Sequence, residues 1–105
     1  MPLGPKRRGA TEVVALDYEI IQEQASALGR LGRALEAALA ALSAHETGGG
    51  SRDAVRARLV REASEALWYF VVQREACGLR DQRAILREYR VPAEVYARMG
   101  CFDRP

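Results

Sequence analysis

The residues with the clearest potential for chemistry are two polar side chains that interrupt an apolar stripe. Asp17 and Gln24 lie seven residues apart within the apolar arc of a helix expected to run to about Ala44. If a second helix folds back on this one, Arg80 would face Asp17, and Gln73 or Arg74 would face Gln24. Polar groups on a packed face need hydrogen-bonding partners. The sequence therefore predicts a candidate polar cluster: Asp17, Gln24, Gln73, Arg74 and Arg80.

This polar cluster has two interpretations. In the structural one, an ion pair and an amide contact fix the register of the two helices, as interior polar residues do in coiled coils. In the functional one, the same residues form a ligand-binding or catalytic site at the open end of a helical hairpin. We favour the structural interpretation, because structural ion-pair networks commonly resemble active sites.

The other reactive residues carry no catalytic signature. His45 is the only histidine, and it has no cysteine or carboxylate cluster at metal-ligand spacing. Cys77 falls on an apolar stripe and is expected in the core, while Cys101 lies near the C-terminus. Glu-x-x-His, a glycine-rich phosphate loop and Gly-x-Ser-x-Gly are all missing from the sequence. We expect no catalytic, metal-binding or cofactor-binding residue, and favour a protein that is not an enzyme.

Helical periodicity organises the chain. The first stripe indicates one long helix that begins after Thr11, and the glycines of residues 48–50 should end it. Its apolar members recur at spacings of three, four and their sums: Val13, Leu16, Ile20, Leu28, Leu31, Leu35, Ala38 and Leu42. A second helix is expected from Arg52 to Cys77, where Gly78 would stop it. Two short helices should follow, one from Asp81 to Tyr89 and one from Pro92 to Gly100.

Two long helices joined by a short loop predict an antiparallel hairpin. Folding about residues 48 and 49 would place Leu28 opposite Tyr69 or Phe70, and Ile21 opposite Cys77. The expected fold is therefore all-α, a long hairpin with two short C-terminal helices. We expect a single domain over residues 11–100, a disordered basic arm at 1–10 and a short tail at 101–105.

Composition bounds the function classes. The 105 residues are 49% hydrophobic and carry a net charge of +2, values that fit one globular domain and give no evidence for a polyanionic partner. The longest apolar run, Ala66 to Val72, is far shorter than the roughly 20 residues that cross a bilayer. No membrane span is expected. With two cysteines and no secretory leader in the sequence, the expected location is the cytoplasm.

The same apolar run indicates self-association. On a helix its side chains point in every direction, and a single hairpin covers only one side. Gly29 and Gly32 in the first helix suggest a groove for a closely packed helix. We expect a homodimer completed as a four-helix bundle, with Trp68 of one chain near the glycines of the other. The candidate interface residues are Gly29, Gly32, Trp68, Tyr69 and Val72.

The C-terminal run from Ile85 to Val95 suggests an alternative. It weakly resembles a helix-turn-helix, with Arg90 in the turn position where glycine is usual. Its second helix is short and less basic than real recognition helices, so we do not expect nucleic acid to be the partner. A nucleic-acid binder would need one face with exposed arginines at Arg83, Arg87, Arg90 and Arg98.

Four segments carry a resemblance to a known family: 16–19, 28–33, 67–75 and 91–95. Over roughly residues 11–100 the chain resembles a family of small, all-helical bacterial proteins of unknown function. The resemblance implies an all-helical fold and supplies no activity. We therefore expect a non-catalytic interaction or adaptor module that self-associates, with an unidentified protein partner possible. The first alternative is a small nucleic-acid-binding regulator that uses the C-terminal helix-turn-helix-like segment and the basic N-terminal arm. The third is a ligand-binding protein or enzyme with a polar site near Asp17 and Arg80.

Overall fold

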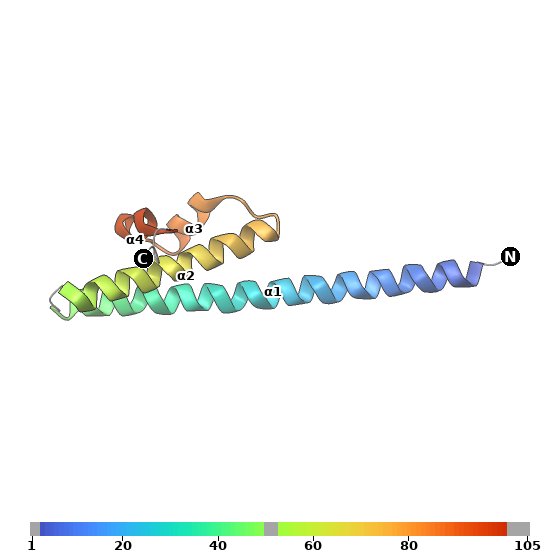
Figure 1. Ribbon diagram of the computed structural model, residues 1–105, viewed down its shortest axis with the longest axis horizontal. Coiled ribbons are helices and arrows are strands. Elements are labelled where there is room, and N and C mark those ends of the chain that lie inside the picture. The colour runs from blue at the N-terminus through green and yellow to red at the C-terminus, as the bar shows by residue number, and fades with distance from the viewer. Residues whose placement is uncertain (1–2, 50–52, 101–105) are drawn as a thin grey trace.

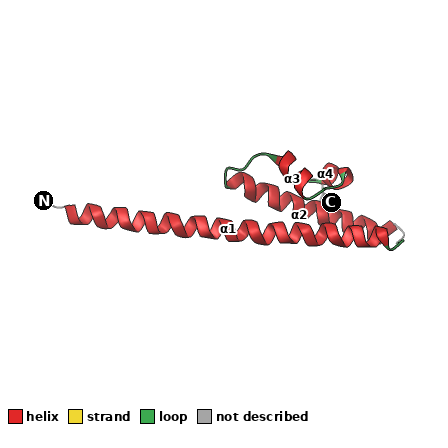
Figure 2. Ribbon diagram, turned by 180° about the vertical axis from the view of Figure 1, so that it is seen from behind, coloured by secondary structure: helices red, strands yellow, loops and turns green. Residues whose placement is uncertain are grey.

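Helices make up the fold. The computed structural model describes residues 3–49 and 53–100, with the side chains of 12–49 and 54–100, and contains no strand in those ranges. Its elements are α1 (Leu3–Thr47), α2 (Asp53–Ala76), α3 (Gln82–Glu88) and α4 (Ala93–Arg98), joined by short loops (Figure 2). The all-α class and the order of two long and two short helices are confirmed. No helix in the described ranges is long and apolar enough to cross a membrane.

Gly78 ends α2 and Asp81 starts α3, as the sequence predicts. Gly78, with φ of 88°, follows α2 in the left-handed conformation that glycine adopts without strain. The Leu79 N–H donates to the Arg74 carbonyl at 2.8 Å, and the Gly78 N–H donates to the Glu75 backbone carbonyl at 3.0 Å. These two bonds form a Schellman motif. Asp81 caps α3 by accepting from the Ala84 N–H at 3.4 Å. Ser51, the expected cap of α2, lies outside the described residues.

The core lies where the second half of α1 meets α2, and α4 closes it from the other side of α2. Its buried hydrophobic members are Leu35, Leu42, Val60, Ala63, Leu67, Phe70, Val71, Ile85 and Val95. Ser64 is buried among them, and its hydroxyl lies 2.8 Å from the Val60 carbonyl and 3.0 Å from the Val95 carbonyl. This contact satisfies a polar group that would otherwise be costly to bury, and it fastens α4 to α2.

The first half of α1 extends past the end of α2 with no described helix beside it (Figure 1). At 1.5 Å per residue, α1 is about 68 Å long and α2 only about 36 Å. The expectation that apolar residues meet along the whole hairpin is therefore wrong: α2 ends within one residue of the expected Cys77, but its position along α1 leaves that end short of Ile21. The register also differs by about one turn: Gly32, not Leu28, lies beside Phe70.

Part of the predicted domain scheme cannot be compared with the structure. α1 begins at Leu3 and runs through Thr11, which is therefore not its cap. The side chains of residues 3–11, where the basic arm was expected, lie outside the described residues. The tail at 101–105, including Cys101, also lies outside them.

The turn between α3 and α4 has a backbone conformation that disfavours its residue. The Val91 N–H donates to the Leu86 carbonyl at 3.0 Å, and the Arg90 N–H donates to the Arg87 carbonyl at 3.3 Å. Arg90 therefore occupies the position after the helix that glycine usually takes. Its φ of 52° is the only positive φ of a non-glycine residue in the described ranges. Arg90 therefore bears a steric cost that glycine would avoid.

We expect Arg90→Gly to raise the free energy of unfolding by about 1 kcal/mol, because it relieves this strain. The matched control is Arg83→Gly inside α3, which should lower it by about the same amount through lost helix propensity. Urea unfolding followed by circular dichroism measures both. A decrease for Arg90→Gly would show that the arginine side chain supplies a stabilising contact that outweighs the strain.

Candidate functional site

The polar cluster predicted from the sequence does not assemble. Asp17 and Arg80 are both exposed, and no ion pair joins them among the described side chains. Asp17 lies on the part of α1 that extends past α2, while Arg80 lies beyond the turn at Gly78. The buried Asp17–Arg80 lock is therefore wrong, because the shifted register of α2 on α1 and the turn at Gly78 keep Arg80 away from Asp17.

The remaining members of that cluster make separate contacts. The Gln73 amide Nε2 lies 3.7 Å from the sulfur of Cys77, the residue that follows α2. The Arg74 guanidinium lies 5.8 Å from the centre of the Phe70 ring, and its Nε is buried without a hydrogen-bond partner. Gln24 is half-buried on α1 and has no hydrogen bond to Arg74 in the described part of the chain. Nothing in this arrangement converges on a common ligand.

The glycine groove is real at Gly32, but the chain itself fills it. A Cβ at Gly32 would lie 3.1 Å from the Tyr89 hydroxyl and 3.5 Å from the Phe70 ring. Phe70 and Tyr89 pack edge to face with centroids 5.5 Å apart, and burial raises the pKa of the Tyr89 hydroxyl. The expectation that Trp68 of a second copy occupies this groove is therefore wrong. At Gly29, a Cβ would meet the guanidinium of Arg33 on the same helix.

The exposed part of the apolar run in α2 forms a smaller surface than the sequence suggested. Trp68, Tyr69 and Val72 remain 37%, 50% and 43% exposed, whereas their neighbours Leu67 and Val71 are buried in the core. Trp68 packs edge to face on Tyr69 at 5.4 Å and lies beside Gly100, at the end of α4. The C-terminal part of the chain therefore covers one side of Trp68.

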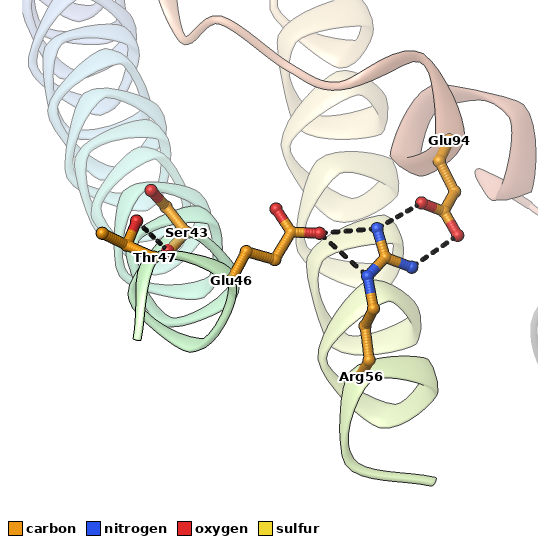
Figure 3. Close-up of polar contacts among 5 residues, drawn as sticks. All are labelled: Ser43, Glu46, Thr47, Arg56 and Glu94. Atoms are coloured by element: carbon orange, nitrogen blue, oxygen red, sulfur yellow. Dashed lines mark hydrogen bonds and ion pairs between the residues drawn. The ribbon is translucent and has the colours of Figure 1, made fainter. Parts of the chain in front are cut away.

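The polar cluster that the structure does contain is centred on Arg56. Its guanidinium binds Glu94 through two hydrogen bonds of 2.7 and 3.0 Å, in the paired geometry typical of strong arginine–carboxylate contacts. The same group donates from Nε to Glu46 at 2.8 Å (Figure 3). Because Glu46, Arg56 and Glu94 lie on α1, α2 and α4, the cluster ties three helices together. The hydrogen bonds from Arg56 lower the pKa of Glu94, and the two carboxylates raise the pKa of Arg56.

A cavity of about 280 Å³ lies next to this cluster, between the end of α1 and the turn that joins α3 to α4. Its lining residues are Leu39, Leu42, Ser43, Glu46, Tyr89, Arg90 and Pro92. Its one carboxylate, Glu46, is already engaged by Arg56. The described side chains contain no group of three or more His, Cys, Asp or Glu placed to hold a metal ion. The geometry here supports a structural joint between helices.

The four arginines of the helix-turn-helix-like segment, Arg83, Arg87, Arg90 and Arg98, are all exposed. However, α4 is only six residues long and is held against α2 by Val95, which is fully buried, and by Glu94 through Arg56. A recognition helix needs a free face of polar residues for the major groove. Much of α4 is committed to the rest of the fold.

We expect Glu94→Gln to lower the melting temperature above pH 5 and to have progressively less effect in acid. A carboxyl whose pKa is lowered by folding stabilises the protein above its ordinary pKa, about 4.5, and that contribution disappears as pH falls through the lowered value. Melting curves from pH 7 to pH 2.5 measure the difference from wild type. The control is Glu62→Gln, which removes only the exposed Arg58–Glu62 pair within α2. An equal difference at every pH would show that Glu94 acts through packing and not through its charge.

Comparison with known proteins identifies a family and no activity. No match was found among curated proteins or among solved structures. The profile described as Family of unknown function (DUF6665) matches residues 5–105, which is nearly the whole chain. The resemblance predicted for residues 11–100 is thereby confirmed over a slightly longer span. The chain belongs to this family of unknown function.

Proposed function

We propose that the protein is a non-catalytic helical interaction module that self-associates as a homodimer. The observation that carries the proposal is the projecting segment, residues 12–24 of α1. Its large aliphatic side chains are 54–66% exposed: Val13, Val14, Leu16, Ile20 and Ile21. Large aliphatic side chains gathered at the surface in this number indicate an interaction site.

Helix energetics support a partner for the projecting segment. A helix of this length without tertiary contacts is marginal in water, because most helical stability comes from packing an amphipathic face. The remainder of α1 obtains that packing from α2, and the projecting segment does not. A bound partner would supply it by removing aliphatic side chains of this segment from water.

The repeat along α1 supports another helix as this partner. Large aliphatic residues recur every seven positions at Val14, Ile21, Leu28, Leu35 and Leu42. The last three pack in or against the core, where α2 covers them. Val14 and Ile21 continue the same line beyond the end of α2, and a seven-residue repeat is the pattern of helices packed side by side.

Charge favours a second copy over a polyanion. Residues 12–29 contain four carboxylates and no lysine or arginine: Glu12, Asp17, Glu19 and Glu23. This segment would repel nucleic acid, whereas the arginines on the rest of the chain would attract it to another copy. Nucleic-acid binding through α3 and α4 is a second candidate because their four arginines are exposed. The third, a ligand site or enzyme near Asp17 and Arg80, loses its basis because these residues stay apart.

We also propose that the protein works in the cytoplasm. The sequence holds only two cysteines, Cys77 and Cys101, which are too few for a disulfide framework. Thiols persist in reducing compartments, which is consistent with this location.

Light scattering at about 50 micromolar protein tests the self-association. We expect a mass near twice the 11.6 kDa of the chain, and a return to 11.6 kDa for Ile20→Asp, which places a charge on the projecting segment. The control is Tyr96→Asp, which alters a comparably exposed apolar residue on α4 and should leave the dimer intact. A wild-type mass of 11.6 kDa contradicts the proposal. An Ile20→Asp variant that stays dimeric places the interface elsewhere.

A further inference from the structure

Building on the proposed self-association, we infer how the two copies fit together. We propose that two α1 helices pack antiparallel and cross at Ala27, so that the projecting segment of each chain lies along the second half of the partner's α1. In this register large side chains of one copy meet alanines of the other. Opposite charges meet along the same edge.

The contact face in this register lies about 100° around α1 from the line of Val14 and Ile21, and it has the required side-chain sizes. Val13, Leu16 and Ile20 lie on this face in the first half of the helix. At the same helical spacing the second half presents Ala34, Ala38 and Ala41, of which Ala34 and Ala41 are exposed. With Ala27 opposite its own copy, Val13 faces the partner's Ala41. Leu16 then faces the partner's Ala38, and Ile20 faces the partner's Ala34. Each of these three large side chains is thus paired with an alanine, which allows the two helices to pack closely.

The rest of the chain leaves Ala34 and Ala41 exposed on this face, while Ala38 at its edge packs partly against the core. α3 approaches α1 on another side, where Tyr89 packs at the position of Gly32. Because successive residues turn by about 100°, Ala34 points to nearly the opposite side of the helix from Gly32, about 160° away. A second α1 can therefore reach Ala34 and Ala41 without displacing α3 or α4.

Charged residues of opposite sign flank Ala27 beside the same face. Glu19 and Glu23 precede it, and Arg30 and Arg33 follow it. All four are exposed, and none makes an ion pair with another described residue of the chain. The antiparallel register brings Glu23 to the partner's Arg30 and Glu19 to the partner's Arg33, and symmetry repeats both contacts. A parallel pair would instead place like charges at the same height on the two helices, so that no glutamate faces an arginine.

Charge reversal tests this register by sedimentation equilibrium. Glu23→Arg and Arg30→Glu should each raise the dimer dissociation constant about tenfold, because each turns two symmetric attractions into repulsions. An equimolar mixture of the two variants should recover the wild-type affinity as a heterodimer, since each reversed charge then meets its opposite. The double variant should also recover it. The control, Glu88→Arg on α3, makes the same charge change and should leave the constant unaltered.

The outcomes separate this inference from the self-association on which it rests. If Ile20→Asp dissociates the dimer while both reversals leave its affinity unchanged, self-association stands and the proposed register is wrong. If Glu23→Arg tightens the dimer, the helices are parallel and the inference is also wrong. If the wild type is a monomer, both proposals fail. Weakening by each single variant with recovery in the mixture supports the antiparallel register.

Discussion

The difference in length between the two long helices is the constraint on which the rest of the structure depends. α1 has 45 residues and α2 has 24, so the apolar line along α1 is covered over only part of its length. Where α2 is present, Leu35 and Leu42 are buried at 0% and 3% exposure. Beyond its end, equivalent positions such as Ile21 are 64% exposed. A chain that builds so long a helix without an internal partner for it has a surface suited to an external one.

The rest of the fold makes the covered half a single body. α4 is fastened to α2 by Ser64, and the Arg56 cluster joins α1, α2 and α4 at the closed end of the hairpin. Tyr89 packs at Gly32 and connects the end of α3 to the middle of α1. These contacts engage Ser64, Arg56 and Glu94 within the fold. The large aliphatic side chains of the projecting segment, in contrast, stay exposed. This distribution is the basis of the interaction role proposed above.

Local signals in the sequence predicted the helices well, and long-range packing much less so. Gly78 and Asp81 mark helix ends through backbone geometry and capping, which depend only on neighbouring residues. The Asp17–Arg80 pair failed because its prediction assumed an ion pair across the open end of the hairpin, and α2 stops before reaching Asp17. Gly32 did signal a close approach, but its occupants come from α2 and α3. The Arg56 cluster was missed because the position of Glu94 depends on how α4 docks, which no local pattern encodes.

Hydrogen exchange of the backbone amides in residues 12–24 tests the central claim most directly, because it reports on the projecting segment itself. If a second copy covers this segment, its amides should be protected at high protein concentration, and the protection should fall on dilution through the dimer dissociation constant. The amides around Leu35, packed within one chain, should keep their protection at every concentration. Fast exchange in residues 12–24 at all concentrations would contradict the account, and so would protection that dilution does not change.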